Sequence, residues 1–92
     1  MTERTATIGS DSGLHARPAA IFAEAAGNQP VEVTIAHPDT PAEDALDAAS
    51  VLSLMSLGAE KGDTVVLRAE GDGAEQALDE LAAVLEHNHD QS

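Results

Sequence analysis

The stretch Gly13-Leu14-His15-Ala16-Arg17-Pro18-Ala19-Ala20 joins two segments with different patterns. The short apolar run TATIG, residues 5–9, precedes it and is typical of a strand. After it, residues 16–26 are mainly alanine with isoleucine and phenylalanine, which favours a helix. Pro18 is compatible with that helix, because N–H groups in the first turn have no intrahelical partner anyway. The stretch therefore predicts a strand-to-helix junction with His15 at the N-terminal cap of the helix.

This position has chemical consequences for His15. A helix start carries roughly half a positive charge, so an imidazole there tends to stay neutral and keeps a nucleophilic lone pair. Its unpaired N–H groups are suited to binding a phosphate, and the guanidinium of Arg17 can bind the same oxygens. These are the components of a phosphoryl-transfer site, with His15 as nucleophile and Arg17 as the stabilising cation. From spacing alone, a solvated histidine beside a surface arginine remains the commoner arrangement.

The string GLHARPA, residues 13–19, resembles the active-site signature of HPr, the histidine-containing phosphocarrier of the phosphoenolpyruvate-dependent sugar phosphotransferase system. Two further segments match in the order of that family. ASVLSLMSLG, residues 49–58, resembles its serine-site helix, and residues 61–71 resemble its last strand. The three matches span nearly the whole chain.

The resemblance implies that enzyme I, itself phosphorylated by phosphoenolpyruvate, passes the phosphoryl group to His15, which passes it to an enzyme IIA domain. The protein would then be a carrier and a substrate of enzyme I rather than an enzyme, with no cofactor. Ser50 matches the regulatory serine of the family. The implied partner-binding residues are Ala16, Ala20, Val51, Leu52 and Met55. The alternative is an HPr-like regulatory binding module without net sugar flux.

Length and charge limit the other function classes. Ninety-two residues predict one domain with a modest core. Four lysines and arginines against 17 acids give a net charge of −13, which argues against nucleic acid as a partner. No run is apolar enough for a membrane span, no signal core is present, and there is no cysteine. We therefore expect a monomeric cytoplasmic protein.

The charge also departs from the family pattern. Many HPr proteins carry lysines on the first helix, where this chain has Glu24 and Gly27. An acidic surface, scarce lysine and a core of small residues together suggest adaptation to a saline cytoplasm; the alternative is an ordinary acidic bacterial protein. In the saline case thermal stability should rise with KCl, because salt screens the repulsion between acids.

Taken with the resemblance, the patterns predict an α+β fold, an open-faced β-sandwich in which three helices cover one face of a four-stranded antiparallel sheet (βαββαβα). The domain would cover residues 1–88, with a disordered tail at 89–92. The predicted strands are 4–9, 31–36 and 63–70, and the predicted helices are 16–26, 50–57 and 74–87. Residues 43–48 favour a helix by themselves, whereas the resemblance implies a short edge strand within a loop, 38–48, that is longer than usual.

Two expectations concern burial and histidines. The predicted core face of the first helix comprises Pro18, Ile21, Phe22 and Ala25. That of the last helix comprises Ala77, Leu78, Leu81, Ala82 and Leu85. The short helix 50–57 has almost no polar side, so part of it should be exposed; the alternative is that all of its apolar residues belong to the core. No metal site is expected, because the histidines at 87 and 89 lie in a hydrophilic tail, and His37 should have no chemical role.

Overall fold

The structure, a computed structural model, describes residues 1–11, 13–14 and 16–87. Its elements are β1 (Thr2–Thr7), α1 (Ala16–Gly27), β2 (Val33–Ala36), the 3₁₀ turn η1 (Ala42–Asp44), β3 (Leu46–Asp47), α2 (Val51–Leu57), β4 (Thr64–Ala69) and α3 (Ala74–Glu86). The edge strand implied for residues 43–48 is therefore confirmed as β3. The helix that the same residues favour by composition is reduced to the single turn η1, because β2 pairs with β3 instead.

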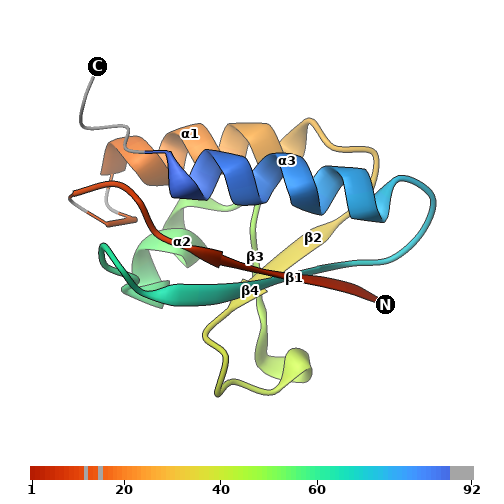
Figure 1. Cartoon of the computed structure of the whole chain (residues 1–92), viewed down its shortest axis with the longest axis horizontal. Coiled ribbons are helices and arrows are strands. Elements are labelled where there is room, and N and C mark those ends of the chain that lie inside the picture. The colour runs from red at the N-terminus through yellow and green to blue at the C-terminus, as the bar shows by residue number, and fades with distance from the viewer. Residues whose placement is uncertain (12, 15, 88–92) are drawn as a thin grey trace.

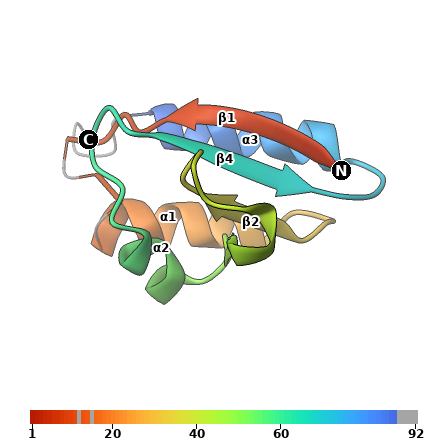
Figure 2. The same cartoon turned by 90° about the horizontal axis from the view of Figure 1, so that it is seen from below.

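The four strands form one antiparallel sheet in the order β1-β4-β2-β3. α1 and α3 lie side by side across one face of the sheet, and α2 lies against α1 and β3 (Figures 1 and 2). This arrangement confirms the predicted fold class. No helix in residues 1–11, 13–14 and 16–87 is long and apolar enough to span a membrane.

The first strand lies earlier in the chain than predicted. β1 covers Thr2–Thr7, whereas residues 4–9 were expected. Ile8 still bonds to the segment before β4, because its N–H donates to Asp63 O and its carbonyl accepts from Gly62 N–H. Gly9 N–H instead donates to the carbonyl of Leu85, and this bond turns the chain toward the C-terminal end of α3.

The buried face of α1 is also rotated from the prediction. Pro18 and Phe22 are buried as expected, but Ile21 and Ala25 are only half-buried. The remaining buried positions of α1 are Ala19, Ala23 and Ala26. Alanines let the helix approach the core closely, so the larger Ile21 lies at the border of the buried face.

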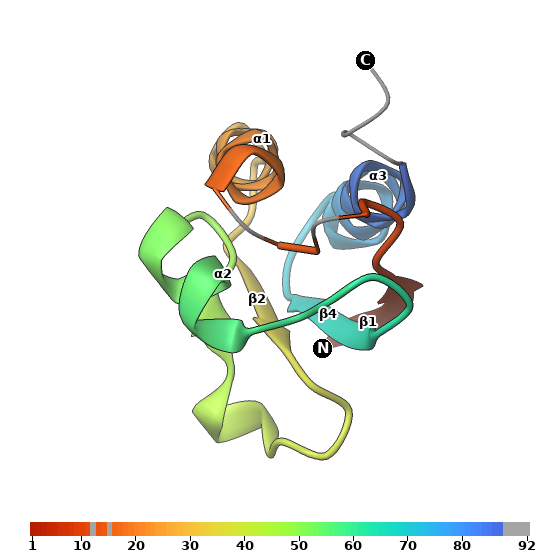
Figure 3. The same ribbon diagram turned by 90° about the vertical axis from the view of Figure 1, so that its left-hand side faces the viewer.

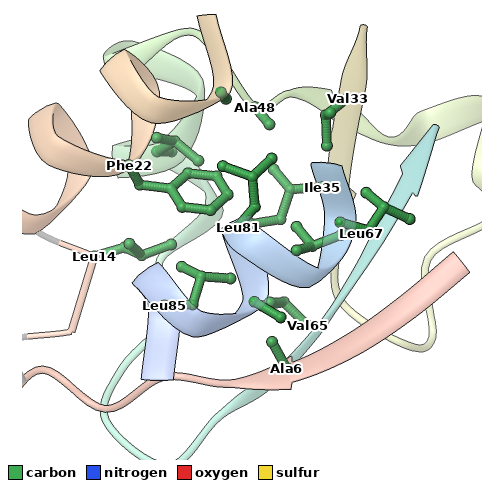
Figure 4. Close-up of a cluster of buried hydrophobic side chains, with 14 of the residues drawn as sticks. Ala6, Leu14, Phe22, Val33, Ile35, Ala48, Val65, Leu67, Leu81 and Leu85 are labelled. Carbon is green, nitrogen blue, oxygen red and sulfur yellow. The ribbon is translucent and has the colours of Figure 1, made fainter. Parts of the chain in front are cut away.

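The core lies between the helices and the sheet. The ring of Phe22 lies close to Leu81 of α3 and Ile35 of β2 (Figure 4), and all three side chains are buried. All five predicted core residues of α3 are buried, which confirms its amphipathic pattern. The small residues of the sequence therefore pack around a few large side chains.

The other face of the sheet is only partly open. Ala36 and Val66 are paired on neighbouring strands and are both buried, although their neighbours Ile35 and Leu67 point to the helical side. The loop 37–45, which contains η1, lies on the side of the sheet opposite α1 and α3 (Figure 3). We conclude that this loop shields one end of the sheet from water.

Candidate functional site

The predicted nucleophile His15 lies outside the described residues, so its neighbours define the site. α1 begins at Ala16, directly after it. Leu14 is buried, and its N–H donates to the carbonyl of Ala59 at 2.9 Å. Gly13 has a φ of 70°, and a Cβ there would lie 2.5 Å from the same Ala59 oxygen. Only glycine therefore fits at this turn into the helix.

The chain before this turn is fixed on the C-terminal end of α3. Gly9 N–H donates to Leu85 O at 2.9 Å, and the buried Ser10 donates its hydroxyl to His87 O at 3.3 Å. A Cβ at Gly9 would lie 2.0 Å from the carbonyl oxygen of Glu86. These contacts join residues more than 70 positions apart, and only the glycine in TATIG hinted at a close approach.

An ion pair holds the same loop from the other side. Lys61 Nζ lies 2.5 Å from Asp11 Oδ1, and both side chains are more than half exposed. Lys61 follows α2, so this pair and the contact of Leu14 with Ala59 both connect the loop before α1 to the segment after α2. The described residues before α1, 9–11 and 13–14, are thus held on two sides.

Arg17 lies exposed in the first turn of α1, and this turn contains no acidic residue. The other three cations are paired: Arg4 with Asp79, Lys61 with Asp11 and Arg68 with Glu3. Within residues 1–11, 13–14 and 16–87, Arg17 makes no ion pair. Its guanidinium and the N–H groups at the start of this 12-residue helix can therefore both bind an anion.

The predicted partner-binding residues come from two helices that pack against each other. Ala16 and Ala20 are exposed on α1. On α2, only Leu54 is buried, whereas Val51 is 36%, Met55 45% and Leu52 80% exposed. The structure thus confirms that α2 is partly exposed, and α2 lies against α1 (Figure 3).

Ser50 is the N-cap of α2. Its backbone is extended, and its hydroxyl oxygen accepts from Ser53 N–H at 3.3 Å. The helix ends at Gly58, which adopts a left-handed conformation with φ 69°. The hydroxyl of Ser50 therefore stabilises the start of α2, directly before the exposed Val51.

His37 has a structural contact that sequence reasoning missed. Its ring Nε2 lies 2.8 Å from the carbonyl oxygen of Leu57, the last residue of α2. The half-buried ring thereby joins the loop after β2 to the C-terminal end of α2. No sequence motif signals this contact, because it depends on how the loop folds.

The C-terminal tail, where no metal site was expected, lies largely outside the described residues. Within those residues, no group of three His, Cys, Asp or Glu side chains could hold a metal.

Comparison with known proteins establishes the family of the chain. The family model described as "PTS HPr component phosphorylation site" matches residues 2–87. The phosphocarrier protein HPr of Streptomyces coelicolor is 45% identical over 85 residues, covering 92% of this chain and 88% of that protein. HPr of Haloferax volcanii is 43% identical over 83 residues, covering 90% of this chain and 91% of that protein.

Solved structures give the same result. The phosphocarrier protein HPr of Bacillus anthracis has a TM-score of 0.81 at 30% identity, covering 91% of this chain and 95% of that one. An HPr structure from Thermoanaerobacter tengcongensis has a TM-score of 0.79 at 36% identity, covering 94% of this chain and 92% of that one. The chain therefore belongs to the HPr family, the phosphocarrier proteins of the phosphotransferase system.

Proposed function

We propose that this phosphocarrier accepts a phosphoryl group on His15 from phosphorylated enzyme I and passes it to an enzyme IIA domain in the cytoplasm. The observation that supports this most directly is the string GLHARPA at the start of α1, with Arg17 exposed and without an ion pair among the described residues. The carrier acts as a monomer and as a substrate of enzyme I, and it needs no cofactor.

The transfer step balances without a further reactant. The lone pair of the neutral His15 imidazole attacks phosphorus, so that a new N–P bond forms as the bond to the donor breaks. The N–H groups at the start of α1 and the guanidinium of Arg17 stabilise the charge on the three phosphoryl oxygens. In the second half of the cycle, the nucleophile of the IIA domain attacks the same phosphorus and regenerates the imidazole.

The exposed apolar side chains of α2 are the proposed docking contacts of both partners. Val51, Leu52 and Met55 act together with Ala16 and Ala20 of α1. Ser50 is the proposed regulatory position, since a phosphate there would add about −1.5 to −2 charges at the edge of the apolar surface. Docking would have to remove water from that charge, which opposes binding.

Acid-labile labelling tests the acceptor. The protein is incubated with labelled phosphoenolpyruvate and the enzyme I of the same genome, and the label is measured before and after mild acid. We expect one acid-labile phosphate per chain in the natural protein and none in His15→Ala. The variant should stay folded, because loss of a helix cap costs only about 0.5–2 kcal/mol.

Two further variants complete this experiment. His37→Gln removes a different imidazole and should be labelled normally, whereas Arg17→Ala should be labelled about 10²–10³-fold more slowly, as for loss of one charge-stabilising group. Label retained in a folded His15→Ala protein would refute the assignment. Tight binding of enzyme I without any labelling of the natural protein would instead support the regulatory module.

A further inference from the structure

The exposed side of α1 and α2 has an unusual distribution of charge. We call it the α1–α2 face, formed by Arg17, Ala20 and Glu24 of α1 with Val51, Leu52 and Met55 of α2. The three α1 residues follow one another at spacings of three and four, so they lie on one side of the helix, and all three are exposed. The centre of the face is apolar, and its charged residues are one cation and one acid.

In the described part of the chain, the other lysines and arginines are all in ion pairs. Arg4 and Arg68 lie on strands β1 and β4 and are paired with Asp79 and Glu3. Lys61, after α2, is paired with Asp11. The positive charge of the α1–α2 face therefore resides in Arg17 alone.

Acids lie on α1 and next to α2. The Asp47 carboxylate accepts from Ala49 N–H at 2.9 Å, which places it just before the start of α2. Glu60 follows the end of α2 and is exposed, as is Glu24 on α1. Within the described residues, the Glu24 carboxylate has no ion-pair partner. Exposed acids therefore lie before and after α2 and on α1.

Phosphorylation strengthens this asymmetry. In the proposed function, Arg17 binds the phosphoryl oxygens, so its charge is neutralised whenever the carrier is loaded. The remaining charged residue of the face is then Glu24, with Asp47 and Glu60 next to α2, on a chain of net charge −13. A partner with an acidic border would be repelled at every step of the cycle.

We propose that the α1–α2 face is recognised by a partner surface with an apolar centre and a border of lysines and arginines, one of which lies opposite Glu24. This inference rests on the proposed function for the identity of the partner, enzyme I, and adds the chemistry of its surface. Charges at the border of an interface mainly change the association rate and its salt dependence. The attraction should therefore weaken as KCl screens it.

Steady-state phosphorylation by the enzyme I of the same genome tests this proposal. The KM for the carrier is measured between about 0.05 and 0.5 M KCl, a range over which the screening length falls well below the size of the face. We expect KM to rise several-fold with KCl while kcat changes little. Glu24→Lys should raise KM about threefold to tenfold at low salt, and its KM should depend less on KCl.

Asp72→Lys is the matched control, with the same change in net charge. Asp72 is exposed in the turn between β4 and α3, at the opposite end of the molecule from α2 (Figure 1). It should raise KM by less than half as much as Glu24→Lys. A KM that falls or stays constant as KCl rises, or a Glu24→Lys variant that binds no worse than Asp72→Lys, would overturn the inference. Failure of the proposed function is distinct from both, because the natural protein would then carry no phosphate at any salt concentration.

Discussion

α2 and α3 are both rich in apolar residues, yet they place them differently. In α3 the leucines face the core and the acids face water, so the core accounts for its large apolar residues. In α2 only Leu54 is buried and Leu57 packs partly buried against the core, while Leu52 remains 80% exposed. Exposed apolar side chains that gather on one helix are typical of a surface that contacts another protein. We therefore propose that α2 contacts partner proteins.

The largest expected effect is on the free energy of unfolding, which a substitution in α3 should lower more than one in α2. Leu81→Ala in α3 should lower the free energy of unfolding by about 2–5 kcal/mol, because it leaves a cavity in the core. Leu52→Ala in α2 should lower it by less than about 0.5 kcal/mol, because the side chain is exposed. Urea denaturation of both variants at the same KCl concentration measures the difference. Similar losses would show that α2 belongs to the core.

For partner binding, we expect substitutions in α2 to have a larger effect than substitutions in α3. Leu52→Glu or Met55→Glu should raise the KM for enzyme I by about tenfold or more, since a carboxylate would have to be desolvated against an apolar surface; tenfold corresponds to about 1.4 kcal/mol. The matched control is Ala83→Glu, an exposed position of α3, which should leave KM unchanged. Circular dichroism verifies that each variant is folded. An equal rise in the control would mean that the acquired charge, and not the surface, is responsible.

The cap of α2 allows a finer test. Ser50→Asp keeps an oxygen that can accept from Ser53 N–H, so stability should be retained while KM for enzyme I rises a few-fold. Ser50→Ala loses the cap, about 0.5–2 kcal/mol, but adds no charge and should change KM less. Denaturation and steady-state kinetics on the pair separate the two effects. If Ser50→Asp binds as tightly as the natural protein, Ser50 is only a cap.

The smallest expected effect concerns His37. His37→Leu removes the donor to Leu57 O and should destabilise the protein by about 0.5–1.5 kcal/mol, with faster amide exchange at the end of α2. His37→Gln retains an N–H donor and should restore most of the loss. Equal exchange rates in the two variants would show that the hydrogen bond does not hold α2.

These helices also show what the sequence can predict. α3 was predicted correctly because acids and leucines alternate with helical spacing, so its buried face is unambiguous. The buried face of α1 was predicted incorrectly, because alanine occurs both in cores and on surfaces and does not mark a buried face. The prediction therefore placed Ile21 in the core. Ile8 and Gly9 look like a continuing strand, but Gly9 N–H donates to Leu85 O of α3, a contact that no local pattern signals.

For the site, too, the sequence predicts the chemical groups but not the tertiary contacts around them. The resemblance of a seven-residue motif predicts His15 as the acceptor and Arg17 as its cation, roles that spacing alone left open. The contacts that hold the loop, such as Ser10 with His87 and Lys61 with Asp11, depend on tertiary packing and carry no local signal. His37 is the clearest case, since its partner is the end of a helix 20 residues later.

The central claim, that the chain carries phosphate between two partners, is tested most directly by a chase. The protein is labelled by enzyme I and phosphoenolpyruvate, freed of both, and mixed with an enzyme IIA domain of the same genome. We expect the acid-labile phosphate to leave this chain and to appear on the IIA domain in equal amount, with no label transferred in a parallel experiment on His15→Ala. Label that remains on this chain, or that is released only as inorganic phosphate, would contradict the account.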